Sequence, residues 1–139
     1  AQMVGLAFDY EQTKVANTFD AHRLVHYATS AGKGDEVAEA LFRAYFVEGR
    51  NVGDHETLAQ LGAAAGLPED DVREVLRSGR FADEVRHDLQ TAARFGINSV
   101  PCFVLDRKYA VSGAQGSPVL LQALQQALTE TGGREAVTP

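Results

Sequence analysis

Residues 97–118 read INSVPCFVLDRKYAVSGAQGSP, and this stretch decides the fold. Within it, 100–105 is apolar and short enough for a buried strand, 106–108 is a polar turn, and 109–112 can return as a second strand. Gly113 permits a sharp bend, and Ser117 followed by Pro118 is typical of an N-cap with proline at the first helical position. The stretch therefore predicts a β-hairpin followed by a helix.

Pro101 stands at the head of the first predicted strand. Because proline has no N–H to give to a sheet ladder, it belongs at a strand start or in a special geometry such as a cis peptide bond. Only about 5–6% of X-Pro bonds in folded proteins are cis. On that frequency alone, the bond between Val100 and Pro101 is expected to be a trans bond in an ordinary turn.

Composition excludes several classes of protein. The 139 residues are enough for one domain with its own core, and the net charge is −6. Basic residues are scattered among the acids, so neither nucleic acid nor an anionic membrane surface is an expected partner. No window approaches the ~18 apolar residues of a membrane span, and the first residues do not resemble a signal peptide. One cysteine rules out an intrachain disulfide, which fits a cytoplasmic protein.

A helical module occupies residues 17–96. A short strand, Val4–Tyr10, is expected before it. The module itself is predicted to contain five amphipathic helices, each with a capping residue or a glycine stop. They run from Asn17 or Thr18 to about Ala31, from Asp35 to Gly49, from Asp54 to Gly66, from Pro68 to Gly79, and from Phe81 to Gly96.

Several segments resemble one family. The segment 96–101, continued by 103–106 and 109–115, resembles the cis-proline hairpin of the DsbA-like thioredoxin superfamily, and the run VSGAQ at 111–115 is its most specific part. Residues 17–24 and 41–46 resemble the first two helices of the insert found in FrnE-like DsbA oxidoreductases. The resemblance covers nearly the whole chain and predicts that the Val100-Pro101 bond is cis.

The resemblance implies an α/β fold that is mostly helical. It would be a partial thioredoxin-like fold with a helical insertion and a small sheet that contains the cis-proline hairpin. Residues 1–16 and 97–131 would form the thioredoxin-like portion, 17–96 the insert, and 132–139 a frayed tail. In the family, a first strand and a helix that carries the reactive cysteines come before the strand expected at 4–10. We therefore expect the chain to be the C-terminal portion of a longer protein.

The implied activity is protein thiol–disulfide exchange. Family members carry it on a Cys-x-x-Cys pair, whereas this chain has Cys102 alone, so no catalytic residue is predicted and the chain by itself is expected to be redox-inactive. It would supply a cis-proline platform and a helical lid for a protein or peptide thiol or disulfide substrate, or for glutathione. No cofactor is expected, with glutathione as a candidate ligand.

The resemblance also implies the substrate-binding residues. Val100 and Pro101 would present main-chain groups to an extended peptide, which pairs like an added strand. Gly113, Ala114 and Gln115 lead into a helix N-terminus, where a carboxylate is favoured. The cleft beside the helical insert would be lined by Asn17, His22 and Arg23. A structural interpretation stays open for each, with Asn17 as a helix cap, Arg23 as a solvated charge and Pro101 as part of a turn.

Two other patterns are interpreted as structural. Cys102 lies in an apolar run, where a packed thiol is expected rather than a nucleophile. His22 and His26 have the i, i+4 spacing of a metal pair, but no third ligand has a convincing spacing, so no metal site is predicted.

Two alternative functions stay open. One is the related glutathione-using branch, which contains kappa-class transferases and 2-hydroxychromene-2-carboxylate isomerases, although the VSGAQ run departs from its usual sequence. The other is a redox-inactive binding module that forms a homodimer through an exposed sheet edge.

Overall fold

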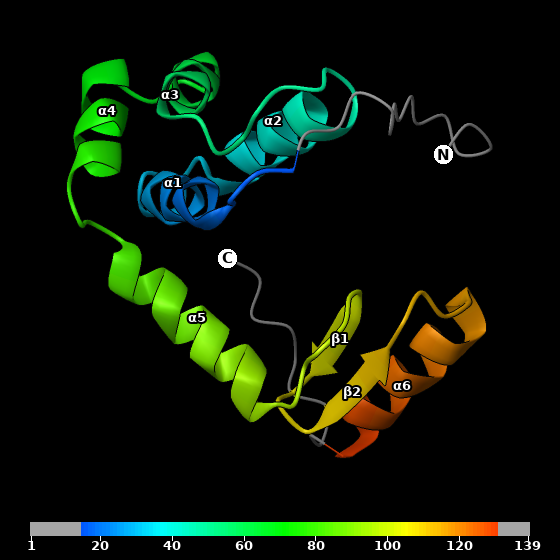
Figure 1. The fold of residues 1–139 in the computed structure, drawn as a ribbon. Coiled ribbons are helices and arrows are strands. Elements are labelled where there is room, and N and C mark those ends of the chain that lie inside the picture. The colour runs from blue at the N-terminus through cyan, green and yellow to red at the C-terminus, as the bar shows by residue number, and fades with distance from the viewer. Residues whose placement is uncertain (1–14, 131–139) are drawn as a thin grey trace. The chain divides into compact units, whose positions relative to one another are not determined.

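The computed structural model describes residues 15–130. In chain order the elements are α1 (Phe19–Ser30), α2 (Gly34–Phe46), α3 (His55–Ala64), α4 (Glu69–Arg77), α5 (Ala82–Arg94), β1 (Cys102–Leu105), β2 (Tyr109–Ser112) and α6 (Ser117–Glu130) (Figure 1). The chain divides into two units, residues 1–90 and 91–139. The strand predicted at Val4–Tyr10 and the tail 132–139 lie outside the described residues, and the predicted division into thioredoxin-like portion and insert stays a prediction.

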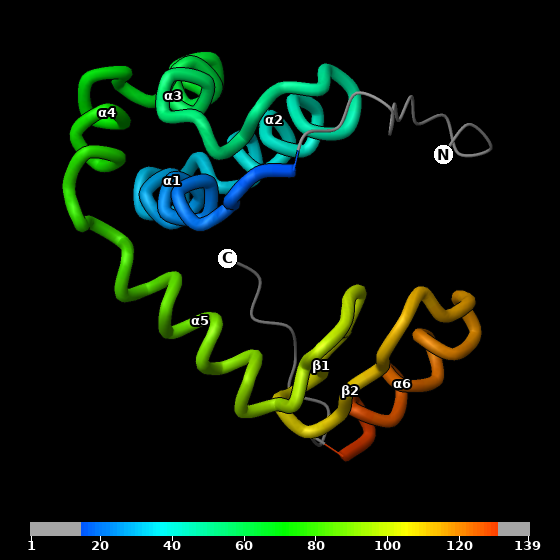
Figure 2. The backbone as a smooth tube through the Cα atoms, in the orientation of Figure 1, coloured from blue at the N-terminus to red at the C-terminus, as the bar shows by residue number. Residues whose placement is uncertain are grey.

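The first unit packs α1–α4 around an apolar core (Figure 2). Leu24 of α1, Leu58 of α3 and Val72 of α4 are completely buried. Gly62 lets α3 and α4 approach closely, since a Cβ there would lie 2.9 Å from a methyl carbon of Val72. The predicted helical module is therefore present, with its core formed by one face of each of these helices.

The helix starts follow the predicted caps in part. Asp54 caps α3 as predicted, because its carboxylate accepts a hydrogen bond of 2.8 Å from the N–H of Thr57. The cap predicted at Asp35 is wrong, since α2 begins at Gly34 with Lys33 before it. At Gly34 a Cβ would lie 2.6 Å from the Thr29 hydroxyl oxygen, so the tight connection from α1 needs glycine there and starts the helix early.

Two large apolar side chains on these amphipathic helices are exposed. Phe42 of α2 is 61% exposed and Leu89 of α5 is 61% exposed. The buried residues of α5 are Ala82 and Val85, which both lie near its start. The helical periodicity thus predicted correctly that each helix forms. It did not show over what length each helix packs against a neighbouring element.

The second unit is an antiparallel hairpin with one helix against it. Strands β1 and β2 pair in the register Cys102 to Ser112 and Leu105 to Tyr109, and α6 contacts both strands. The prediction of a buried first strand is wrong, because Phe103 is 40% exposed and Ala127 is the one buried residue in the described part of this unit. Among the described residues β1 is hydrogen-bonded to a neighbouring strand on one side alone.

Within residues 15–130, none of the helices combines the length and the apolar character that crossing a bilayer requires.

Candidate functional site

The two open ends of the β-hairpin come together at Pro101. The Val100-Pro101 peptide bond is cis. The N–H of Gly113 donates a hydrogen bond of 2.8 Å to the carbonyl of Pro101. Gly113 has a φ of +83°, a conformation that residues with a Cβ rarely adopt, and this glycine lets the chain turn after β2. The structure therefore brings two parts of the predicted site, 100–101 and 113–115, together.

The turn before α6 is held by its own hydrogen bonds. The Gln115 side chain donates to the carbonyl of Ser112 at 2.9 Å, and the Gln115 N–H donates to the carbonyl of Gly113 at 2.9 Å. Of the three predicted contacts for a carboxylate, only Ala114 keeps an N–H without a partner in the described chain. The helix starts one residue earlier than predicted, since Gly116 supplies the first accepting carbonyl and Ser117 is already helical.

Val100 is highly accessible in this loop. Its side chain is 88% exposed, and within the described residues neither its N–H nor its carbonyl has a hydrogen-bond partner. Because Pro101 has no N–H and its carbonyl is bonded to Gly113, Val100 presents the free donor and acceptor at this position. An extended peptide could pair with this residue as an added strand.

Arg23 lies in the first unit and is buried, with 5% exposure. All five of its N–H groups are used: it pairs with Asp20 at 2.7 Å and donates to main-chain carbonyls around the end of α4, those of Val75, Leu76, Ser78 and Arg80. These carbonyls have no partner within a helix that ends at Arg77, so the guanidinium caps α4. This geometry gives Arg23 a structural role in place of the expected substrate contact.

Asp20 and His55 belong to the same network, and sequence reasoning missed both. The Asp20 carboxylate lies 2.7 Å from the Nε2 of His55, at the start of α3. Burial alone would raise the pKa of Asp20, but hydrogen bonds and positive charge from His55 and Arg23 outweigh it and hold that pKa below its usual value. Asp20 and Arg23, both on α1, thus tie this helix to His55 at the start of α3 and to the end of α4.

Asn17 and His22 are both exposed. The Asn17 side chain accepts a hydrogen bond of 2.9 Å from the N–H of Phe19, the first residue of α1, whereas the N-cap position itself is Thr18. His22 lines an apolar groove between α1 and α2 with a volume of about 420 Å³, in which the aromatic rings are those of Phe42, Tyr45 and Phe46. Asn17, His22 and Arg23, which were predicted to line one cleft, therefore have different neighbours. Of the three, His22 is the one that lines this groove.

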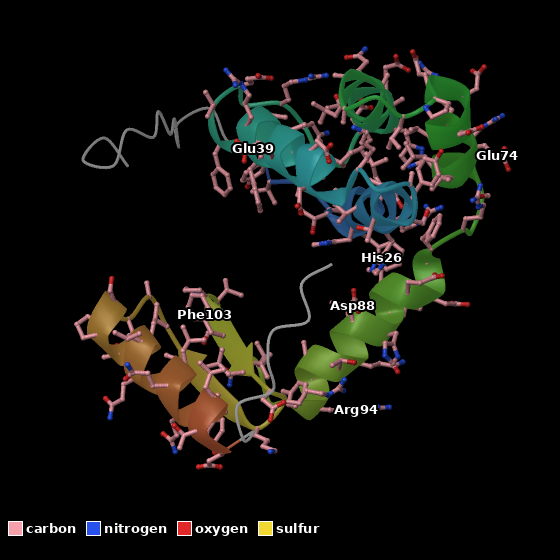
Figure 3. The ribbon with its side chains drawn as sticks, turned by 180° about the vertical axis from the view of Figure 1, so that it is seen from behind. His26, Glu39, Glu74, Asp88, Arg94 and Phe103 are labelled. Carbon is pink, nitrogen blue, oxygen red and sulfur yellow. The ribbon has the colours of Figure 1, made fainter. Side chains whose placement is uncertain are left out.

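His26 is paired with an acid rather than with His22. Its Nε2 lies 2.8 Å from the carboxylate of Asp88 on α5, and the two side chains point toward one another (Figure 3). Among residues 15–130, no group of three or more histidine, cysteine or acidic side chains is placed to hold a metal ion.

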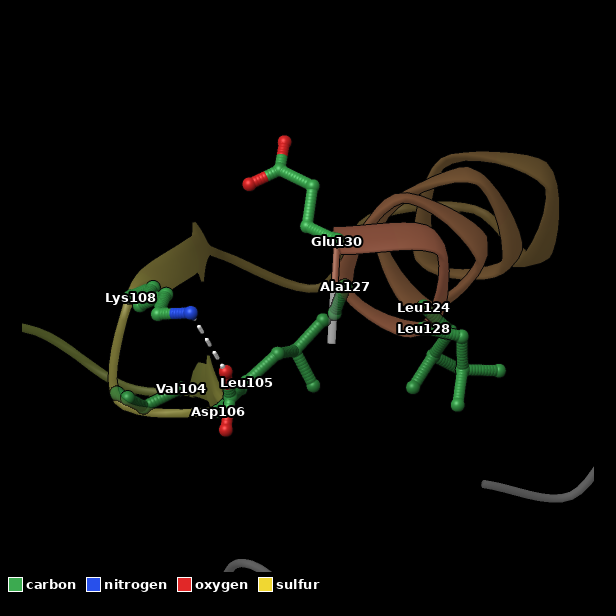
Figure 4. A pocket seen from close by; sticks show the side chains of 8 residues that line it. All are labelled: Val104, Leu105, Asp106, Lys108, Leu124, Ala127, Leu128 and Glu130. Carbon is green, nitrogen blue, oxygen red and sulfur yellow. Dashed lines mark ion pairs between the residues drawn. The ribbon is translucent and has the colours of Figure 1, made fainter. Parts of the chain in front are cut away.

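Cys102 is half-buried at the start of β1, so it is less covered than the packed thiol that the sequence predicted. The hairpin and α6 also enclose an open hollow of about 810 Å³, which sequence reasoning missed (Figure 4). Its lining is mixed, with Val104 and Leu124 beside an ion pair of 3.2 Å between Lys108 and Asp106.

A hairpin that starts with a cis-proline, covered on one face by a helix and preceded by a helical module, is a thioredoxin-like organisation of the DsbA type. The chain belongs to the family of DSBA-like thioredoxin domains, which it matches over residues 1–125.

Two relatives extend this assignment. The crystal structure of a probable DsbA oxidoreductase from Streptomyces coelicolor is 42% identical and superposes with a TM-score of 0.87, covering 100% of this chain and 59% of that one. The uncharacterized protein YwbO from Bacillus subtilis (strain 168) is 30% identical over 100 residues, which are 71% of this chain and 50% of YwbO. The chain thus spans half of YwbO and little more of the structural relative.

Proposed function

We propose that this chain supplies the peptide-binding surface of a DsbA-family thiol–disulfide oxidoreductase, of the FrnE-like group and in a reducing, cytoplasmic setting. Membership of the family and the likeness to a probable DsbA oxidoreductase support the reaction class. The observation that carries the proposal for this chain is Val100, which is exposed beside Pro101 and whose N–H and carbonyl have no hydrogen-bond partner among residues 15–130.

The proposed chemistry divides between two parts of a protein. A thiolate attacks a disulfide of the substrate, a mixed disulfide forms, and a second thiol resolves it. Meanwhile the substrate peptide pairs with the main chain of Val100, which fixes its direction and keeps its sulfur in place. Since the 139 residues contain Cys102 alone, the dithiol step needs cysteines that this sequence does not contain.

A titration of the isotope-labelled chain tests the surface. The probe is a short extended peptide whose central cysteine is blocked as the S-methyl thioether, so that binding is read without exchange chemistry. We expect the amide signals of Val100 and Ala114 to shift and the Val100 amide to gain the temperature dependence of a bonded N–H. Unchanged signals at these residues with millimolar peptide would refute the proposal.

Two substitutions at one exposed position sharpen the test. Val100→Pro removes the N–H, whereas Val100→Ala removes most of the side chain and keeps the N–H. We expect Val100→Pro to lose peptide binding and Val100→Ala to retain it, with circular dichroism checking that both variants fold. Equal losses in both would assign binding to the side chain. Titration with reduced glutathione separates the alternative, since the glutathione-using branch predicts that this tripeptide binds better than the longer probe.

A further inference from the structure

The peptide plane between Ser112 and Gly113 is held from both of its edges. Its N–H, which belongs to Gly113, donates a hydrogen bond of 2.8 Å to the carbonyl of Pro101. Its carbonyl, which belongs to Ser112, accepts a hydrogen bond of 2.9 Å from the side-chain amide of Gln115. Since the N–H and the carbonyl of one trans peptide plane point in opposite directions, the two bonds together fix how this plane is turned.

The direction of the Ser112 carbonyl follows from the pairing of the hairpin strands. In an antiparallel pair, hydrogen-bonded and non-bonded residue pairs alternate along the strands. The bond between Gly113 and Pro101 makes Cys102 with Ser112 the next, non-bonded pair, so the carbonyl of Ser112 points away from β1. A carbonyl oxygen can only accept a hydrogen bond, and the NH₂ group of the Gln115 side chain supplies the donor on that side.

Gly113 and Gln115 depend on each other in this turn. Gly113 adopts its φ of +83° at little cost, but a glycine also allows its neighbouring peptide planes many other orientations. A Cβ on Gly113 would lie 3.4 Å from the Nε2 of Gln115, so the side-chain amide lies directly against the glycine. The main-chain N–H of Gln115 also donates to the Gly113 carbonyl at 2.9 Å. Gln115 therefore holds the peptide planes on both sides of the most adaptable residue of the turn.

The orientation of the Ser112–Gly113 plane affects the residue that is proposed to pair with a peptide. Pro101 directly follows Val100, and its carbonyl is occupied while the Gly113 N–H points at it. If the plane turned over, this carbonyl would lose its donor and would offer a second acceptor beside the carbonyl of Val100. A bound peptide would then have to order this part of the chain, which lowers its affinity.

We propose that Gln115 is a positioning residue for the peptide-binding surface at Val100. It donates to Ser112, keeps the Gly113 N–H on the Pro101 carbonyl, and so leaves the main chain of Val100 as the place where a peptide pairs. This inference rests on the proposed function and assigns Gln115 a role within the turn in place of the direct substrate contact expected from the sequence.

Exchange of single amides with water, measured by NMR on the isotope-labelled chain, tests this role without any ligand. Gln115→Met removes the donor and keeps a side chain of similar length. We expect the Gly113 amide to exchange about three- to tenfold faster in this variant, as the loss of one hydrogen bond predicts. The amide of Val111, which lies in the next bonded pair of the hairpin, should keep its rate. Equal acceleration of both amides would mean that the whole hairpin loosens, and no acceleration would mean that Gln115 holds nothing; either result overturns the proposal.

Peptide affinity tests the consequence for Val100, with the S-methyl-blocked peptide as the probe. At neutral pH neither Gln115→Met nor Gln115→Glu carries a donor, and each is expected to raise the Kd about three- to tenfold. Gln115→Lys keeps a donor on a side chain of similar reach and should bind within about twofold of the wild type. Gln122→Glu makes the same change at another exposed glutamine, in the middle of α6, and should leave the Kd unchanged.

The two sets of measurements separate this inference from the proposed function. A wild-type chain that binds no peptide would refute the proposed function, and the exchange rates would still decide whether Gln115 holds the plane. If the wild type binds and Gln115→Met binds equally well, Gln115 has no positioning role. If Gln115→Lys binds as weakly as Gln115→Met, the amide itself is what the peptide needs, and the inference fails while the proposed function stands.

Discussion

At the scale of single residues, Arg23 is the clearest case of a side chain whose position the neighbouring sequence does not reveal. Its position is set by an ion pair and by hydrogen bonds to distant carbonyls. A buried charge is costly unless it is paired and its hydrogen bonds are made. Arg23 meets this condition through Asp20, three residues before it, and through carbonyls more than fifty residues later in the chain. Its planar fork of five N–H groups reaches more acceptors, and acceptors further apart, than the three N–H groups of a compact lysine ammonium.

Substitution of Arg23 by lysine should therefore lower the stability of the chain by about 2–3 kcal/mol, because several carbonyls at the end of α4 lose their donor. Chemical denaturation followed by circular dichroism measures the change. Arg43→Lys is the matched control, since the side chain of Arg43 is 71% exposed and pairs with Glu48 on the surface. It should cost no more than about 0.5 kcal/mol. Similar values for the two variants would count against the capping role of Arg23.

Whether the sequence could reveal a site residue depends on how close in sequence its interaction partners lie. Val100, Pro101 and the VSGAQ run were predictable because the turn that joins them forms within about sixteen residues and follows a family pattern. The pairing of Asp20 with His55 links positions 35 residues apart, and no local pattern reports it. Arg23 was assigned to a cleft on the family resemblance, and the sequence alone does not show whether an arginine is buried or exposed.

At the scale of elements, the helices were predictable because each carries its own stop or cap. Glycines with positive φ end or follow several of them, including Gly32, Gly66 and Gly96. The starts were harder, since an acidic residue near a helix start can be the cap or can belong to the first turn. Asp54 is the cap of α3, whereas Asp35 lies inside the first turn of α2.

This difference predicts unequal effects of the same substitution. Asp54→Ala removes the acceptor for the Thr57 N–H and should lower the denaturation midpoint clearly, because a helix N–H loses its partner. Asp35→Ala removes a charge that only complements the helix dipole, and its effect should be much smaller. Thermal or urea denaturation of both variants at neutral pH measures which substitution lowers the midpoint more. If Asp35→Ala were the more damaging, the assignment of the two positions would be reversed.

At the scale of the whole molecule, burial is concentrated in the first unit. Of the buried apolar residues in the described chain, all but Ala127 precede residue 90. The sequence predicted a hydrophobic strand at 100–105 and an amphipathic final helix, and both elements exist. What it could not show is how much of each apolar face is covered, since periodicity reports which face is apolar but not what packs on it.

Native-state hydrogen exchange at low protein concentration should reflect this uneven core. Amides of α1 and α3, such as those of Leu24 and Leu58, are expected to exchange slowest, and amides of β2 and α6 should exchange faster by orders of magnitude. Mass spectrometry after proteolysis at several labelling times measures both. Equal protection in the two units would mean that the hairpin and α6 are covered as well as the helical core.

The boundary between the two units falls inside α5, between Gln90 and Thr91, and not in a loop. A helix propagates by adding one hydrogen bond for each residue that is fixed, whereas starting it anew is costly. Order in α5 therefore spreads from the buried turn at Ala82 and Val85 toward Arg94, and the first unit acts as a nucleus for residues at the entry to the second. Loosening that first turn should therefore shorten the helix from its start.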